Sequence, residues 1–155
     1  MTLDDFPLAQ ALQLGHLDAH DQHALVRAGE LSPRELVAAA LMRVRHLDPM
    51  LGALSHVDAD AALEHASRVR RDAPMAGVAW LPKDSLRYLG MPTRGGSRLR
   101  SAASALDALP AAQRFGAAGP VVIGKCDRAE CGRKGSAEQA RGPGPRKPRT
   151  REVAG

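Results

Sequence analysis

The sequence predicts an α/β fold in which N-terminal helices precede a β–α–β segment. Apolar residues recur at helical spacing through the first part of the chain, which predicts the helices. Two short runs of mostly apolar residues, 78–81 and 121–123, flank a further helical stretch, which predicts two strands joined through a helix. Such a connection favours near-parallel strands, and 155 residues suit one domain of ordinary size.

The first helix is expected over residues 8–28. Leu12, Leu17 and Leu25 form a rough apolar stripe along this stretch. Gly29 follows it, and glycine commonly ends a helix because it adopts the left-handed conformation without strain.

The second helix carries the clearest local signal in the chain. Ser32 suits the N-cap, Pro33 the first helical position, and Glu35 completes an S-x-x-E capping box. An apolar face at helical spacing follows, formed by Leu36, Ala40, Val44 and Leu47. The pair Asp48-Pro49 predicts the end of this helix, because proline disfavours helical geometry in the residue before it.

The remaining elements follow from caps and turn residues. Asp58 is expected to cap a third helix that runs to about Arg71. A strand is expected at Val78–Leu81, and glycine and proline then predict a loop-rich connection over 90–96. A fourth helix is expected over 106–118, or from Pro110 onward, before the strand Val121–Ile123, which Gly124 closes.

Composition and charge divide the chain into two predicted parts. Residues 1–140 are expected to fold, with a core poor in large side chains because aromatic residues make up only 3%. Residues 141–155 form a basic tail rich in Pro, Gly and Arg, which has little to bury and is predicted to be disordered. The tail has no aromatic residue for base stacking, so specific binding of nucleic acid is not expected.

Several other classes of protein are disfavoured. The sequence has no long apolar run for a membrane span and no secretory signal, and two cysteines do not make a disulfide framework. A cytoplasmic location is therefore expected. No metal site is predicted: His20 and His23 lack a third ligand, and Cys126 and Cys131 lack zinc spacing and are expected to be small buried residues.

The segment GPVVIGKC (119–126) matches the letters of a phosphate-binding loop, G-x-x-x-x-G-K. Such a loop needs a glycine-rich turn whose backbone amides face the anion. The intervening residues here are Pro, Val, Val and Ile, which favour a strand. We therefore interpret this segment as a strand and not as a nucleotide site.

The most informative stretch is PMAGVAWLPKDS (74–85), in which an apolar strand stops at Lys83. Two interpretations of Lys83 remain open from the residues alone. It is either a solvated strand end, or a base held in a dry site where desolvation favours the neutral amine.

The order of these motifs resembles the amidase signature family. The resemblance rests on the helical stretch 24–66, on PMAGVAWLPKDS (74–85), on GMPTRGGSRL (90–99) and on AAGPVVIGKCDRAECG (117–132). Together these segments cover roughly residues 10–138 in the family's order. The resemblance implies that the chain forms the N-terminal part of an amidase domain, an incomplete portion of the family's mixed-sheet α/β fold.

The resemblance also implies a chemistry. The family hydrolyses the C–N bond of small-molecule amide substrates with a Ser–cis-Ser–Lys triad and no cofactor, and Lys83 occupies the place of the triad lysine. A lysine that accepts a proton near pH 7 must have a pKa about three units below its reference value of about 10.4, which corresponds to about 4 kcal/mol. Burial in a closed site supplies such a shift.

The sequence departs from the family after this region. No Gly/Ser-rich loop follows Lys83, although the family's bridging serine lies on such a loop. We expect a reading frame that is truncated or shifted before that loop, and the Arg/Pro/Gly-rich stretch after Glu138 is typical of GC-rich DNA read out of phase. The chain would then retain only the triad lysine and be inactive alone.

Three functions remain as alternatives at this stage. The first is amide hydrolysis, which the family resemblance implies. The second is a non-catalytic remnant, or a fragment that depends on a complementary chain bearing the missing half. The third, less favoured, is binding of nucleic acid through the basic tail.

Overall fold

The computed structural model describes residues 6–100, 103–133, 135, 137 and 144–150. Helices and short strands alternate along it, which confirms the predicted α/β class. The chain divides into two compact units. The first comprises Met1–His46, Asp58–Trp80 and Arg114–Ile123, and the second comprises Leu47–Val57, Leu81–Gln113 and Gly124–Gly155.

The prediction of one helix over residues 8–28 is wrong. The structure has two helices there, α1 (Leu8–Leu14) and α2 (Ala19–Ala28). The break follows from local chemistry, because the carboxylate of Asp18 accepts a hydrogen bond from the amide of Asp21, 2.9 Å away, and so caps α2. Gly29 ends α2 in the left-handed conformation, with φ at 78°, as predicted.

Helix α3 (Pro33–Leu51) begins as predicted. The amide of Glu35 donates to the Ser32 hydroxyl at 3.1 Å, and the amide of Ser32 donates to the Glu35 carboxylate at 2.7 Å. The predicted stop at Asp48-Pro49 is wrong, since Pro49 lies inside the helix. Pro49 removes one backbone donor near the helix end, where Asp48 compensates by accepting bonds from the two residues after Leu51.

The β–α–β order is present, and both of its strands belong to the first unit. Strand β2 (Ala79–Trp80) pairs in parallel with β3 (Val121–Val122), and α5 (Pro110–Ala117) connects the two in sequence. Near-parallel strands are thus confirmed, and α5 begins at Pro110, the second of the two predicted starts. The preceding helix, α4 (Ala59–Arg68), begins after Asp58 as predicted and ends three residues before Arg71.

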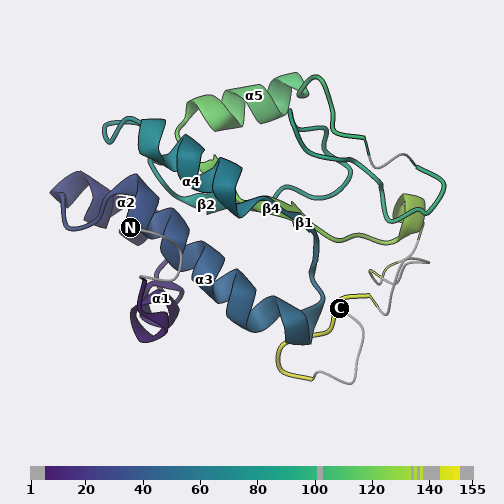
Figure 1. Cartoon of the computed structure of the whole chain (residues 1–155), viewed down its shortest axis with the longest axis horizontal. Coiled ribbons are helices and arrows are strands. Elements are labelled where there is room, and N and C mark those ends of the chain that lie inside the picture. The colour runs from purple at the N-terminus through teal and green to yellow at the C-terminus, as the bar shows by residue number, and fades with distance from the viewer. Residues whose placement is uncertain (1–5, 101–102, 134, 136, 138–143, 151–155) are drawn as a thin grey trace. The chain divides into compact units, whose positions relative to one another are not determined.

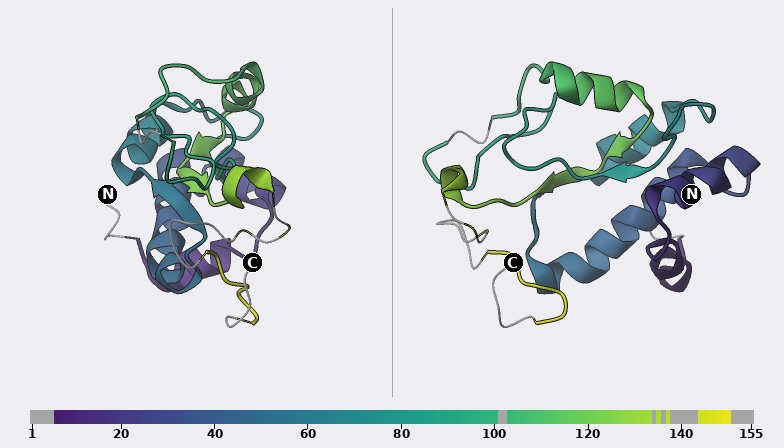
Figure 2. Two further views of the ribbon diagram at one scale, coloured as in Figure 1. Left: turned by 90° about the vertical axis from the view of Figure 1, so that its right-hand side faces the viewer. Right: turned by 180° about the vertical axis from the view of Figure 1, so that it is seen from behind.

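The core of the first unit is built largely from small side chains. Val26, Leu36, Ala76 and Val78 form a buried cluster, and many other buried positions are alanines. Helix α4 packs against β3, and the two further views in Figure 2 show the helix running beside the strands. This composition follows the low aromatic content of the sequence.

The second unit contains a strand pair that the sequence did not predict. Strand β1 (Leu54–Val57) pairs antiparallel with β4 (Gly124–Cys126), and the two lie side by side in Figure 1. Gly124 therefore opens a strand and does not close one. A Cβ on Gly124 would lie 2.3 Å from the carbonyl oxygen of His56, so only glycine permits this approach.

The predicted tail 141–155 is described only over 144–150. Within that stretch Gly144 is buried, and the amide of Arg146 donates to the Leu51 carbonyl at 2.8 Å. Disorder of the other tail residues stays a prediction, since they lie outside the described residues. In the described ranges, none of the helices combines the length and the apolar character needed to cross a membrane.

Candidate functional site

Lys83 lies at a short parallel bridge with Cys126 in the second unit. The amide of Cys126 donates to the Pro82 carbonyl at 3.0 Å, and the amide of Asp84 donates to the Cys126 carbonyl at 3.0 Å. These two bonds bracket Lys83, whose side chain is exposed. The exposed side chain agrees with the first of the two interpretations of Lys83, and its role as a base stays a prediction.

Pro82 fits this pairing. It is buried, and its carbonyl oxygen serves as an acceptor in the bridge, while its missing N–H removes only a donor. The proline is therefore compatible with the short bridge that carries Lys83.

A second lysine, which sequence reasoning did not single out, lies beside this bridge. The Lys125 ammonium is fully buried, with 0% exposure, and lies 3.3 Å from a carboxylate oxygen of Asp84, which is 2% exposed. Its Nζ also donates to the Pro92 carbonyl at 2.8 Å and to the Thr93 hydroxyl at 2.7 Å. All three ammonium donors therefore have an acceptor.

Both oxygens of the Asp84 carboxylate also have hydrogen-bond donors. One oxygen accepts a hydrogen bond from the amide of Arg94 at 3.2 Å, and the other accepts one from the amide of Gly95 at 2.8 Å. The backbone carbonyl of Asp84 also accepts from the Gly95 amide, at 3.1 Å. Asp84 thus holds the loop that was predicted from GMPTRGGSRL (90–99).

Burial shapes the ionisation of this site. Burial lowers the pKa of Lys125, and the negative charge of Asp84 opposes that shift and favours the ammonium. Burial raises the pKa of the Cys126 thiol, while the positive charge of Lys83 acts in the opposite direction. The thiol is therefore not activated as a nucleophile by its surroundings.

The sequence did contain a signal for Lys125. It follows the run Val121–Ile123 and lies in the GPVVIGKC segment, which forms two short strands, β3 and β4, in place of the one strand predicted. A charged residue inside a buried strand needs an opposite charge close by. Local sequence patterns do not identify that partner, because Asp84 is far from Lys125 along the chain.

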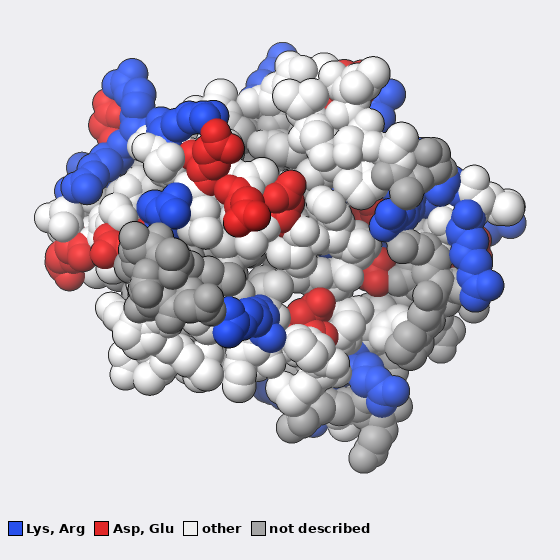
Figure 3. Space-filling view, viewed as in Figure 1, with Lys and Arg blue, Asp and Glu red and all other residues white. Residues whose placement is uncertain are grey.

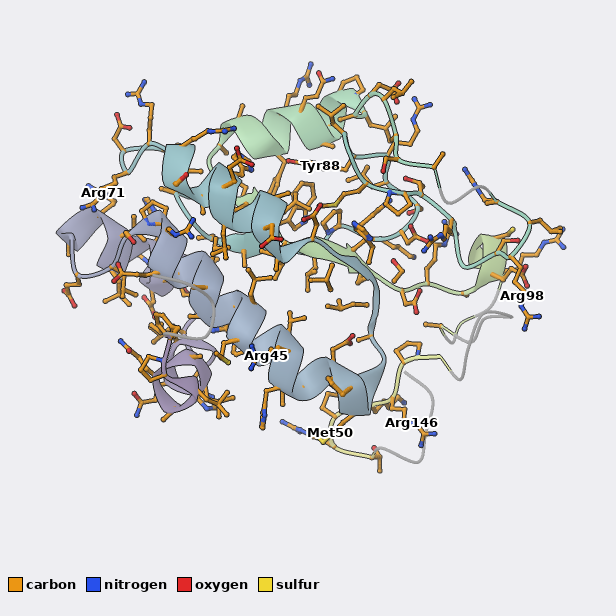
Figure 4. The ribbon with its side chains drawn as sticks, viewed as in Figure 1. Arg45, Met50, Arg71, Tyr88, Arg98 and Arg146 are labelled. Atoms are coloured by element: carbon orange, nitrogen blue, oxygen red, sulfur yellow. The ribbon has the colours of Figure 1, made fainter. Side chains whose placement is uncertain are left out.

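The long connection after Lys83 has few regular elements. An ion pair joins Arg87 to Asp107 at 3.2 Å, and backbone bridges join Leu89 to Ala105 and Pro92 to Ser104. Figure 4 labels Tyr88 and Arg98 along this connection. Tyr88 is half-buried, and burial raises the pKa of its hydroxyl.

The cysteines and histidines give mixed outcomes. The prediction that both cysteines are small buried residues is wrong, because Cys126 is partly exposed and Cys131 is exposed. His20 lies on the solvated side of α2 as expected. It forms an exposed cluster with Asp18 and Asp21 whose potential ligand atoms lie within 4.8 Å of one another. Exposed acidic groups of this kind are common without a metal.

Charges on the surface are mixed in the view of Figure 3. Lys and Arg side chains appear at separate places on the drawn face, with acidic and uncharged residues between them. On this face, and over the described residues, positive charge does not gather into one continuous basic surface.

The chain is similar to known amidases and to a subunit of the glutamyl-tRNA(Gln) amidotransferases. It is 37% identical over 122 residues to the glutamyl-tRNA(Gln) amidotransferase subunit from Thermus thermophilus, a match that covers 79% of this chain and 26% of the relative. It is 33% identical over 128 residues to the putative amidase AmiC of Mycobacterium leprae, covering 83% of this chain and 27% of that relative. No protein-family model matches the chain.

Solved structures give the same result. The 6-aminohexanoate cyclic dimer hydrolase in complex with substrate superposes with a TM-score of 0.83 at 28% identity, over 89% of this chain and 29% of that one. The native peptide amidase from Stenotrophomonas maltophilia superposes with a TM-score of 0.66 at 33% identity, over 74% of this chain and 25% of that one. The chain thus spans about a quarter of the length of its relatives.

Proposed function

The chain belongs to the amidase signature family, and on this premise we propose that it supplies the lysine of an amide-hydrolysing site whose serines lie on another segment. Lys83 is the proposed proton acceptor. Its position at the end of the apolar run Val78–Leu81, held by the bridge to Cys126, is the observation that supports this role. The substrate class is a small-molecule amide.

The proposed chemistry requires three groups, of which this chain offers one. A neutral lysine accepts a proton from a bridging serine, and that serine takes the proton of the nucleophilic serine as it attacks the amide carbonyl. Backbone amides then stabilise the oxyanion. The sequence has no Gly/Ser-rich loop after Lys83 to carry these serines, so we propose that the chain is inactive alone.

The exposure of Lys83 supports dependence on a partner. Proton transfer to a neutral lysine requires that water be excluded from it, and a covering chain would supply that exclusion. Large apolar side chains in the second unit are also left in solvent, with Leu89, Leu99 and Leu106 exposed by 61%, 96% and 95%. We propose that a partner covers some of these side chains, since contact with another chain would remove their apolar area from water.

We further infer a cytoplasmic location for this protein. Both Cys126 and Cys131 are free thiols. Free thiols suit a reducing compartment, and cell fractionation tests the inference.

Fragment complementation tests the proposed function. The chain is mixed with the segment of the Thermus thermophilus relative that follows the matched region, and hydrolysis of a generic aryl amide is measured. We expect turnover in the mixture, no turnover by the chain alone, loss of turnover with Lys83→Ala, and normal turnover with the matched control Cys131→Ser. The control replaces an exposed side chain of the same unit.

Two results would contradict the proposal. Turnover by the chain alone, or a covalent adduct of a serine-directed phosphonate on one of its own hydroxyls, would show that the nucleophile is present. Turnover in the mixture that survives Lys83→Ala would show that Lys83 is not the base.

A further inference from the structure

We propose that the buried ion pair between Asp84 and Lys125 positions Lys83 for proton transfer. The inference rests on the proposed function, which gives Lys83 its chemical role. Asp84 and Lys125 do not themselves touch the reacting atoms in this scheme, so both are positioning residues.

The ion pair joins three segments of the second unit at one point. Lys125 comes from β4, Asp84 follows Lys83, and the acceptors Pro92 and Thr93 belong to the loop. The amides of Arg94 and Gly95 donate hydrogen bonds to the Asp84 carboxylate. The hydrogen bonds described for the pair are therefore all made with other groups of the protein. The pair therefore fixes the loop and the segment that carries Lys83 against β4.

The pair acts on Lys83 through the backbone. Asp84 follows Lys83 in a turn closed by the bond from the Leu86 amide to the Lys83 carbonyl at 2.8 Å, and Asp84 is buried whereas Lys83 is exposed. Lys125, which precedes Cys126, is buried against Asp84. Lys83 and Cys126 are register partners.

This placement is more than general packing. Val121–Ile123 and Val78 are held by apolar burial, whereas the segment around Lys83 is held mainly by polar contacts. These are the two backbone bonds of the bridge, the bond from the Leu86 amide to the Lys83 carbonyl at 2.8 Å, and the ion pair made by the next residue, Asp84. A buried charge accepts few alternative geometries, because each displaced contact leaves a donor or acceptor without a partner. The ion pair therefore restricts where the backbone that carries Lys83 can lie relative to Cys126.

The placement of Lys83 can be measured through its register partner Cys126, because one side chain carries an amine and the other a thiol. o-Phthalaldehyde joins a primary amine and a thiol that lie close together into a fluorescent isoindole. In the full chain we expect this adduct between Lys83 and Cys126, identified by peptide mass analysis. It should vanish with Lys83→Arg or Cys126→Ser and persist with the matched control Cys131→Ser.

The ion pair is then broken in the same full chain. We expect Lys125→Met to lower the yield of the Lys83–Cys126 isoindole about tenfold, since reaction between neighbouring groups falls steeply with misplacement. Lys125→Arg, which keeps the charge, should restore most of the yield. Circular dichroism of each variant reports whether the helices remain.

If Lys125→Met unfolds the chain, a second variant tests the proposal. Asp84→Asn combined with Lys125→Met removes both charges and leaves no uncompensated charge in the interior. We expect this double variant to keep its helices and still lose the isoindole. Normal yield in a folded variant would overturn the proposal, and so would loss of the helices in both variants, because the pair would then serve folding alone.

The isoindole readout contains no catalytic step. Suppose that Lys125→Met lowers the isoindole yield as expected but that the mixed fragments do not hydrolyse the amide. The proposed function would then be overturned, whereas the role of the ion pair in placing Lys83 would stand. If Lys125→Met leaves the isoindole yield unchanged while turnover still depends on Lys83, only the positioning role would be overturned.

Discussion

At the scale of single residues, the second unit contrasts two lysines. Lys83 is exposed at a strand end, and Lys125 is fully buried against Asp84. The family resemblance drew attention to the first, and only the structure revealed the second. Because burying an ion is costly, the internal position of Lys125 depends on having all its donors satisfied.

The stability of the chain should therefore depend on the balance of charge at this pair. We expect Lys125→Met to lower the free energy of unfolding by about 3–5 kcal/mol, because it leaves the Asp84 carboxylate buried without its counter-charge. Urea unfolding followed by circular dichroism measures this loss.

The double variant Asp84→Asn with Lys125→Met is the control for that measurement. It should lose less stability than Lys125→Met alone, since an amide is easier to bury than an unpaired carboxylate. An equal or greater loss would show that shape at this position matters more than charge.

At the scale of elements, the start of α3 is governed by its capping box. The hydrogen bonds from Ser32 hold the pKa of the Glu35 carboxyl below its ordinary value of 4.5. A carboxylate with a lowered pKa in the folded state stabilises the fold above pH 4.5, and this contribution is lost as the pH falls through the folded-state value.

Replacement of Glu35 tests this pH dependence. We expect Glu35→Gln to be less stable than the parent above pH 4.5, and the difference in free energy of unfolding should shrink as the pH falls below that value. Ser32→Ala should cost about 1 kcal/mol, as is usual for loss of an N-cap. A difference between Glu35→Gln and the parent that stays constant with pH would contradict this account.

At the scale of the whole molecule, apolar surface in solvent decides how the isolated chain behaves. Leu99 and Leu106 are almost fully exposed, and Leu89 is more than half exposed. We expect the chain to associate with increasing concentration, which sedimentation measures, because association removes this surface from water.

Charged replacements test which surface is responsible. Leu99→Asp with Leu106→Asp should reduce association, whereas Ala111→Asp, which adds a charge at an exposed alanine, should change it less. A parent chain that sediments as a monomer at every concentration would contradict the prediction.

Much of the local structure could be predicted from the sequence, and the errors have clear causes. The capping box and the start at Pro110 are encoded by neighbouring residues, so they were found. The break at Asp18 was not predicted, because the helical spacing of the leucines on both sides was given more weight than the N-cap signal of Asp18. Strand β1 was not predicted, because its residues are at most partly buried and show no clear apolar pattern. The continuation past Pro49 was missed because a helix end can lose one donor without unwinding.

Local patterns in the chain encode the capped helices, the order of the β–α–β segment and the resemblance to the amidase signature family, because these features depend on bonds and spacings between residues that are close in sequence. Tertiary packing alone leaves Lys83 exposed and buries Lys125 against Asp84. Those outcomes depend on which distant segments exclude water from each charge, and that exclusion arises only when the segments pack together.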